Sequence, residues 1–413
     1  MDKIDLQVYL QMMRSVQDSI LAFIEKLNIN EEDFHHLKIF LKNQNFPTDR
    51  YELKTFLYLI LYISNNHHRT TNFIIRIKQI ILIFKEEIKK YYTNNEIFNI
   101  FKGNKFILFL LFQEKLIILN SYIESVLTSD ANKNNSYKYF FYNELKKSLK
   151  RDFCSKIESI LKTELNTNSM RTVQAFCDKN RQIGENDLQI CQLIREDSLN
   201  KFKEYVKESN TSLSKKVKLS IFETNNFLIN NTPNLIEYSA FFGSIEIFKY
   251  LLSNQIELTS SLWLYAIHSN KLELIQLLEE NNVSPPKNDF KECLMESIKC
   301  HHQNITNYIL SKYFENISDI KEKILPQAFK FYNFFYQPNE NSDFIPFFNS
   351  LCKSDYYTIV NALLQSNEID LNAKRIIKKT LFFYLISNKK IFNEIFAKFF
   401  FSNVVSIFYV LLM

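Results

Sequence analysis

Hydrophobic residues in the first part of the chain recur every three or four positions, the spacing that places side chains on one face of an α-helix. The clearest stripe is apolar at all positions but one and consists of Leu6, Leu10, Met13, Gln17, Ile20, Leu21 and Ile24. Asparagine-rich breaks at 43–47, 64–66, 92–95 and 130–135 separate further apolar segments. Such breaks are typical of turns between helices. The pattern predicts a helical N-terminal domain over residues 1–165.

A second pattern begins at about residue 187 and repeats. Five anchor positions are each followed, at offsets of four, five, eight and nine residues, by mostly apolar side chains. The anchors are Asp197, Gly243, Asn270, His301 and Asp355. The four offsets share one face of a helix, so an amphipathic helix is predicted after each anchor. Gly, Asn and Asp tolerate a left-handed backbone best, and His is enriched there, so the anchors are predicted to be turns between two helices.

Helices are also predicted on the N-terminal side of four anchors, over 235–242, 262–269, 293–300 and 346–354. The spacings between consecutive anchors are 46, 27, 31 and 54 residues, whereas a regular ankyrin array repeats about every 33 residues. We therefore expect an irregular stack, with a partial unit around 325–336 in the longest gap. The alternative is a chance pairing of aliphatic residues, which the coincidence of five anchors with turn-forming residue types disfavours.

The predicted fold is thus all-α. It comprises a helical N-terminal domain followed by an irregular, ankyrin-like helix-turn-helix repeat stack. The repeats are expected to occupy 187–315. Partial and degenerate ankyrin repeats with an apolar C-terminal tail are expected over 316–413.

Several segments also resemble a family of ankyrin-like proteins, known as a domain of unknown function, that is expanded in trichomonad parasites. They are residues 64–69, 191–197, 220–225, 235–251, 262–270 and 296–302. The resemblance implies helix-turn-helix stacking and a binding role, and it implies no known activity. The chain departs from the family's pattern after 370–373, where a regular repeat gives way to a degenerate one. It then runs into the apolar segment 399–413, where a terminal repeat normally presents a polar outer face.

Glycine is scarce, with three residues in 413, at positions 103, 184 and 243. This excludes a glycine-rich phosphate loop and leaves tight turns to Asn and Asp, which favours helices over sheets. The net charge is only +6, and opposite charges lie at helical spacing in runs such as 85–90. These charges indicate solvated helix faces, so no nucleic-acid partner is expected.

Three adjacent histidine pairs, at 35/36, 67/68 and 301/302, raise the question of a metal site. Neighbours on a helix point about 100° apart, so we expect that such a pair does not close on one ion. Cys293 and Cys300, near the last pair, lack the spacing of a zinc site. Nucleophile, zinc-protease, phosphate-loop and dinucleotide motifs do not occur in the sequence. We therefore predict no metal, no cofactor and no catalysis.

Six cysteines are scattered along the chain without a Cys-x-x-Cys pair, and the first residues lack the apolar core of a signal peptide. Reduced thiols and a cytoplasmic location are therefore expected.

The function predicted from this architecture is a non-catalytic scaffold that binds an unidentified protein partner. Contacts with the partner are expected at positions that the repeat does not need for packing, namely Phe241, Phe242, His268, Ser269, Asn254, Gln255 and Glu257. Varied side chains at these offsets are also what an unconstrained surface shows. Trp263, between two leucines in a repeat helix, is expected in the core.

Two alternatives to this function stay open. One is a membrane-associated protein held by residues 395–413, although the apolar run there is shorter than the roughly 20 residues that span a bilayer. The other is a truncated family member without independent function.

Overall fold

The computed structural model describes residues 6–28, 30–44, 46–70, 72–129, 136–314, 317–338, 348, 351, 352, 354 and 356–365. Across these residues every regular element is a helix, apart from one isolated bridge between Lys216 and Asn234. The predicted all-α class is confirmed.

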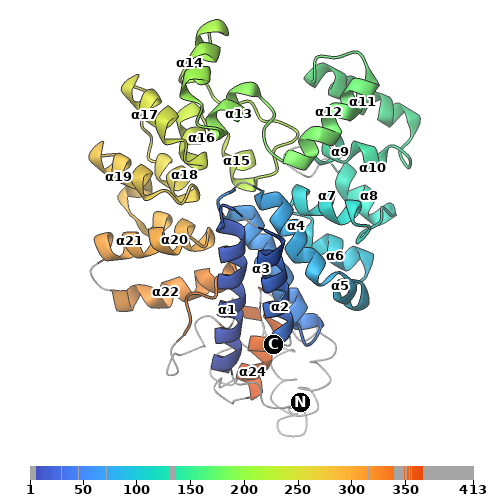
Figure 1. Cartoon of the computed structure of the whole chain (residues 1–413), viewed down its shortest axis with the longest axis vertical. Coiled ribbons are helices and arrows are strands. Elements are labelled where there is room, and N and C mark those ends of the chain that lie inside the picture. Colours follow the sequence, from blue (N-terminus) through green and yellow to red (C-terminus); the bar gives the residue numbers. More distant parts are fainter. Residues whose placement is uncertain are drawn as a thin grey trace, which may run out of the picture.

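The helices of the N-terminal part are α1 (Leu6–Glu25), α2 (Glu31–Asn43), α3 (Arg50–Asn66), α4 (Phe73–Ile83), α5 (Lys85–Tyr91), α6 (Asn94–Phe101), α7 (Lys105–Gln113), α8 (Ser121–Thr128), α9 (Ser136–Phe140), α10 (Tyr142–Leu145), α11 (Arg151–Glu164) and α12 (Met170–Ile183). They are followed by α13 (Gln189–Arg195), α14 (Leu199–Glu208), α15 (Asn226–Asn231), α16 (Leu235–Phe242), α17 (Ile245–Ser253), α18 (Leu262–His268), α19 (Leu272–Glu280), the short 3-10 helix η1 (Pro286–Asn288), α20 (Lys291–Lys299), α21 (Gln303–Tyr313), α22 (Ile317–Lys330) and α24 (Tyr357–Gln365). In Figure 1, α1, α3 and α4 stand in the centre with α13 and α15 above them, α14 and α16 to α22 lie along the left, and α6 to α12 lie on the right.

Asparagine is a frequent helix-capping residue in this glycine-poor chain. Five helices begin with an asparagine whose side chain accepts a hydrogen bond from a first-turn N–H group, which is a stabilising cap. These residues are Asn30, Asn104, Asn120, Asn225 and Asn234. Helix α3 ends at Asn66 and α6 begins at Asn94, inside two of the predicted breaks. The break at 130–135 lies outside the described residues.

Four of the five anchors are left-handed turns, as predicted. Their φ angles are 47° at Asp197, 71° at Gly243, 55° at Asn270 and 59° at His301. The residue after three of them donates its backbone N–H to the carbonyl five residues earlier, as Ser244 does to Ser239. This bond ends the first helix of each pair and fixes the direction in which the second begins.

The longest gap contains a further unit of the same kind. Helix α22 is followed by Tyr332 with a φ of 56°, and Asn333 donates its N–H to the carbonyl of Ala328. The first helix and the turn of the predicted partial unit around 325–336 are therefore present, and within the described residues no second helix directly follows this turn. The fifth anchor, Asp355, lies outside the described residues, but Tyr356 donates the equivalent bond to Leu351.

The turns separate a set of inner helices from a set of outer helices. The inner helices α13, α16, α18, α20 and α22 contact one another in that order, and the outer helix α14 contacts α17. The predicted offsets are the buried face of the helices after the anchors, for example Ile247, Phe248 and Leu251 in α17, Leu274, Ile275 and Leu278 in α19, and Ile305, Ile309 and Leu310 in α21. Trp263 is buried, and its Nε1 donates to the carbonyl of Val283 (2.8 Å), so its core position is confirmed.

The buried apolar residues form two cores. One joins α13 to α21 and includes Ile324 and Ala328 of α22. The other fills the N-terminal helices, extends to Val173 and Cys177 of α12, and includes aromatic residues from the far end of the chain, such as Phe329 and Tyr356. Helix α24 contacts both α1 and α3. The far end of the described chain thus returns to the N-terminal helices, which the repeat pattern did not predict.

All six cysteines are free thiols. No helix in the described ranges is long and apolar enough to cross a membrane. Residues 370–373, where the repeat pattern degenerates, and the apolar segments 395–413 and 399–413 lie outside those ranges.

Candidate functional site

The inner face of the repeat stack is covered by other parts of the same chain. The ring of Phe227 in α15 stacks on Phe241 of α16 at 5.9 Å and lies 4.1 Å from the ring of His268 of α18. The adjacent Asn226 donates its Nδ2 to Asn65 Oδ1 (3.1 Å) and to the Gly103 carbonyl (2.8 Å). The segment containing α15 therefore joins the end of α3 and the start of α7 to the inner helices of the repeats. We call this region, where α15 and the end of α3 meet the inner helices, the joint.

This joint changes the set of predicted partner contacts. Three of the predicted residues, Phe241, His268 and Ser269, are buried, and a fourth, Phe242, is half-buried. Phe241 and His268 meet Phe227 of their own chain, so they offer no accessible surface to another protein. The repeat pattern missed this because it specifies the packing between repeats and carries no information on what covers their other face.

The remaining predicted contacts, Asn254, Gln255 and Glu257, are exposed. They lie in the connection between α17 and α18, where Asn254 caps α17 and Gln255 has a left-handed φ of 57°. The structure thus separates the seven predicted residues into an inner group within the joint and an outer group on a free connection.

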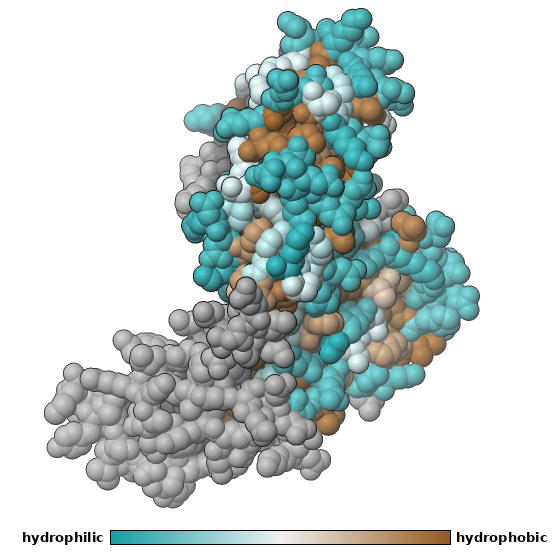
Figure 2. Space-filling model, turned by 90° about the vertical axis from the view of Figure 1, so that its left-hand side faces the viewer, coloured by the Kyte–Doolittle hydropathy of each residue, from teal (hydrophilic) through white to brown (hydrophobic). Residues whose placement is uncertain are grey.

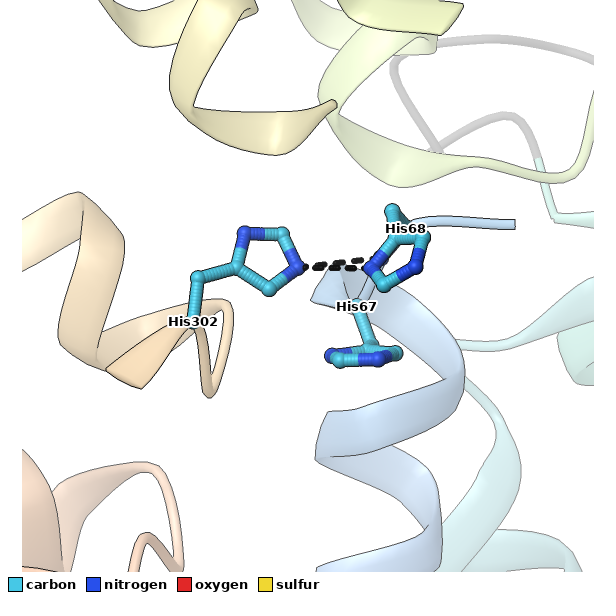
Figure 3. Close-up of side chains that lie close together, drawn as sticks. All are labelled: His67, His68 and His302. Carbon is cyan, nitrogen blue, oxygen red and sulfur yellow. Dashed lines mark hydrogen bonds between the residues drawn. The ribbon is translucent and has the colours of Figure 1, made fainter. Parts of the chain in front are cut away.

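A cluster of histidines lies in the joint. Five of the seven histidines in the chain meet there: His67, His68, His268, His301 and His302. Figure 3 shows three of them, with His67 and His68 leaving the end of α3 and His302 facing them from the turn before α21. The closest contact joins His68 Nδ1 and His302 Nε2 at 3.0 Å.

The neighbouring side chains of His67 and His68 lie on the same side of the chain. Helix α3 ends at Asn66, and His67 has an extended backbone with φ −69° and ψ 150°. The two ring centroids are only 4.3 Å apart. The expectation that an adjacent pair points apart assumed a helix, and for this pair the assumption is wrong.

Backbone carbonyls fix the orientation of two of these rings. His302 Nδ1 lies 2.8 Å from the carbonyl of Ile267, to which it can only donate, so Nε2 carries the lone pair that faces His68. His67 Nδ1 lies 2.9 Å from the carbonyl of Cys300. The other nitrogen of His67 is 3.0 Å from Glu25 Oε1 in a direction that makes no hydrogen bond.

A second polar group adjoins the first. His268 Nε2 is 2.7 Å from Glu296 Oε1, and Lys299 Nζ is 2.7 Å from the same oxygen. The Cys300 sulfur lies 3.5 Å and 3.7 Å from the two nitrogens of His268. Burial alone would raise the pKa of Glu296, but the hydrogen bonds from His268 and Lys299 and the charge of Lys299 lower that pKa to about 2. Burial also lowers the pKa of His268, so this imidazole acts as a neutral hydrogen-bond donor at neutral pH.

Burial keeps most of the clustered imidazoles uncharged at neutral pH. It lowers the pKa of His68 to about 2 and that of His301 to about 3, and nearby His67 adds to both shifts. Burial likewise lowers the pKa of His302 well below its ordinary value. Neutral imidazoles keep one lone pair each, so the cluster can accept hydrogen bonds or bind a metal ion.

A cavity of about 360 Å³ lies apart from the joint, between α9, α10, α11 and α12. Arg181 is one of the residues that line it; its side chain is buried, donates to Glu144 Oε1 at 2.6 Å and lies over the ring of Phe109 at 4.3 Å. Because one carboxylate and an aromatic ring already engage this guanidinium, we regard it as a structural cation.

Comparison with protein-family models, with curated proteins and with solved structures finds no match to this chain.

Proposed function

We propose that this protein is a non-catalytic scaffold for protein–protein interaction, built from ankyrin-like repeats and working in the cytoplasm. The observation that carries the proposal is the series of inner helices that pack on one another in sequence order, each ending in a left-handed turn. Such stacks present an extended rigid surface, which is the usual basis of their binding. The resemblance of 235–251 and 262–270 to an ankyrin-like family agrees with it.

The joint points to the face that a partner would use. The inner helices are covered by α15 and by the end of α3, whereas the outer helices α14, α17, α19 and α21 have only their inward sides buried. Figure 2 views the molecule from the repeat side, where the described surface is mostly hydrophilic with smaller hydrophobic patches. We therefore place the partner on the outer helices and on connections such as 254–257.

We propose that a partner recognises the charged side chains on this face. Lys249 and Glu273 form an ion pair between α17 and α19 at 2.7 Å. Glu257 is exposed in the connection after α17, and Glu280 is exposed at the end of α19. Exposed charges at an interface chiefly set the rate and specificity of association, so reversing them should weaken a specific complex.

The test uses the tagged full-length chain in its own cell, with partners quantified by mass spectrometry. We expect a protein recovered in stoichiometric amounts, and recovery reduced at least about tenfold by the double variant Glu257→Arg/Glu280→Arg. The matched control is Asp152→Arg/Glu86→Arg, two exposed acids outside the repeats, which should leave recovery unchanged. The proposal fails if no stoichiometric partner is found, or if both double variants reduce recovery equally.

A further inference from the structure

In the histidine cluster, ring nitrogens converge as they do in metal sites, and partner binding by the outer helices does not require this arrangement. We propose that His67, His68 and His302 form a zinc site that fastens the end of α3 to the repeat stack. One nitrogen from each ring lies within 4.8 Å of the others. Three imidazoles with a fourth ligand are a common zinc environment.

The distances suit an ion of this size. Zinc–nitrogen bonds of about 2.0–2.1 Å in tetrahedral geometry place two ligand nitrogens about 3.4 Å apart. His68 Nδ1 and His302 Nε2 are 3.0 Å apart, so they need to separate by only a few tenths of an ångström. In Figure 3 these two nitrogens face each other, while the His67 ring is seen edge-on beneath them. To complete the site, the His67 ring would have to turn about its Cβ–Cγ bond and exchange the hydrogen bond from Nδ1 to the Cys300 carbonyl for the bond from Nε2 to zinc.

The surroundings of the rings resemble the outer shell of a metal site. A zinc-bound histidine usually donates its other N–H to a carbonyl or carboxylate, which fixes the ring and its tautomer. His302 already does so to Ile267. The buried Nε2 of His67 has no hydrogen-bond partner, and Glu25 beside it is the candidate for the fourth ligand.

The protons balance without an added reactant. In the metal-free joint, His68 donates its Nδ1 proton to the lone pair of His302 Nε2. When zinc takes both nitrogens, His68 gives up that proton and takes one on Nε2, so the ring stays neutral. His68 is only half-buried, and solvent can reach its ring during this exchange.

The neighbouring group of His268, Glu296 and Cys300 fits an ion less well. The Cys300 sulfur is almost equally far from both nitrogens of His268 and so lies along the lone pair of neither. Glu296 is already held by His268 and Lys299. We assign this group a structural role in holding α18 to α20.

The test is a titration of the full-length, chelator-treated protein with Zn²⁺ by calorimetry, and with Co²⁺ by absorption. We expect one equivalent of zinc with a dissociation constant in the micromolar range or below, a cobalt spectrum typical of tetrahedral coordination, and a higher melting temperature with zinc. His302→Asn keeps a donor for the Ile267 carbonyl and removes the ligand atom. It should weaken binding by about a hundredfold, and His67→Ala by about tenfold.

The matched control is His35→Ala/His36→Ala, which removes an exposed histidine pair on α2 and should bind zinc like the unaltered chain. Circular dichroism of metal-free His302→Asn reports whether it folds. If it does not, His68→Ala, at the half-buried position, decides instead. The proposal is overturned if no saturable one-to-one binding occurs, if the variant at 302 or 68 binds zinc unchanged, or if the control abolishes binding.

Discussion

In the repeat stack, each inner helix packs on the next inner helix in the sequence. The N-terminal core, by contrast, is completed by segments from the opposite end of the sequence. Gln17 of α1 bonds Asn333 across 316 residues, and Gln337 bonds the carbonyl of Leu10 across 327. Tyr51 of α3 stacks on Tyr357 of α24 at 3.5 Å. The stack is therefore one-dimensional, while the N-terminal part is closed by long-range contacts.

This difference between local and long-range packing predicts that the repeat stack and the N-terminal core unfold as separate cooperative units. A stack of local contacts loses structure near the site of damage, whereas a core shared by both ends of the chain should lose both ends together. The histidine cluster lies between the two units and is the point at which they are coupled.

The largest expected effect comes from a cavity in the shared core. Phe56 is fully buried and meets Phe84 edge-to-face at 4.9 Å. Phe56→Ala should lower the free energy of unfolding by about 3–5 kcal/mol. Hydrogen exchange should then show lost protection in α1 to α4, at the end of α22 and in α24 alike.

Trp263→Ala in the repeat core is the counterpart and should cost about as much. Its loss of protection should be confined to α16 to α21. If both variants deprotect the whole chain equally, the two regions form one cooperative unit and the comparison is wrong.

Acidification should destabilise the joint, and this loss of stability is the next largest expected effect. In the unfolded chain the histidines titrate near pH 6.5, whereas burial in the folded chain lowers the pKa of His68 to about 2. Below pH 6.5 the unfolded chain takes up protons that the folded joint excludes, so stability is retained above this pH and lost as pH falls. Over the step from about pH 7.5 to 5.5, His68 and His301 together should cost about 3 kcal/mol.

The measurement is chemical denaturation of the chelator-treated protein at the two pH values. The charged groups around the cluster are Glu25, Glu296, Lys271 and Lys299. The pKa of Glu296 is lowered to about 2, so that carboxylate does not titrate in this window. The double variant at the exposed pair 35/36 should lose as much stability as the unaltered chain. A pH-independent free energy of unfolding would show that the joint does not exclude protons.

A smaller effect should follow from removing one long-range hydrogen-bonding side chain. Gln17 is buried, donates to Asn333 Oδ1 at 3.2 Å and accepts from the Phe334 N–H at 2.7 Å. Gln17→Leu leaves these partners buried without it and should cost about 1–3 kcal/mol. Gln11→Leu, at an exposed position of the same helix, is the control and should change stability by less than about 0.5 kcal/mol.

The same contrast explains how much the sequence could predict. The buried offsets in α17, α19 and α21 were predictable because helical periodicity is a local property. The asparagine breaks at 64–66 and 92–95 were predictable because capping is local too. The meeting of His68 with His302 was not, because the two are 234 residues apart and no periodicity relates them. Phe241 and His268 were placed on the surface because nothing in their repeat indicates that Phe227 covers them.

The smallest expected effect concerns the turns themselves. Gly243 has a φ of 71°, and a β-carbon there would lie 2.9 Å from Lys271 Cγ. Because Cγ lies near the backbone end of that side chain, Lys271 must shift, and Gly243→Ala should cost about 1–2 kcal/mol, as for a left-handed alanine, or more. Asn270 holds the equivalent turn at 55°. Asn270→Ala should cost nearly as much, and Asn270→Gly should be within about 0.5 kcal/mol of neutral, since glycine tolerates the turn but loses more entropy on folding.

The free energies of unfolding of Gly243→Ala, Asn270→Ala and Asn270→Gly, measured by chemical denaturation, test whether the anchors are equivalent. If the turns are equivalent repeat elements, the two alanine variants lose similar stability and the hydrogen-exchange loss stays within α16 to α19 in both. A loss at Asn270 that reaches α1 or α3 would instead tie that turn to the shared core. Asn270 closely follows His268, which is packed in the joint, so it is the anchor at which the boundary between local and long-range stability is most sharply tested.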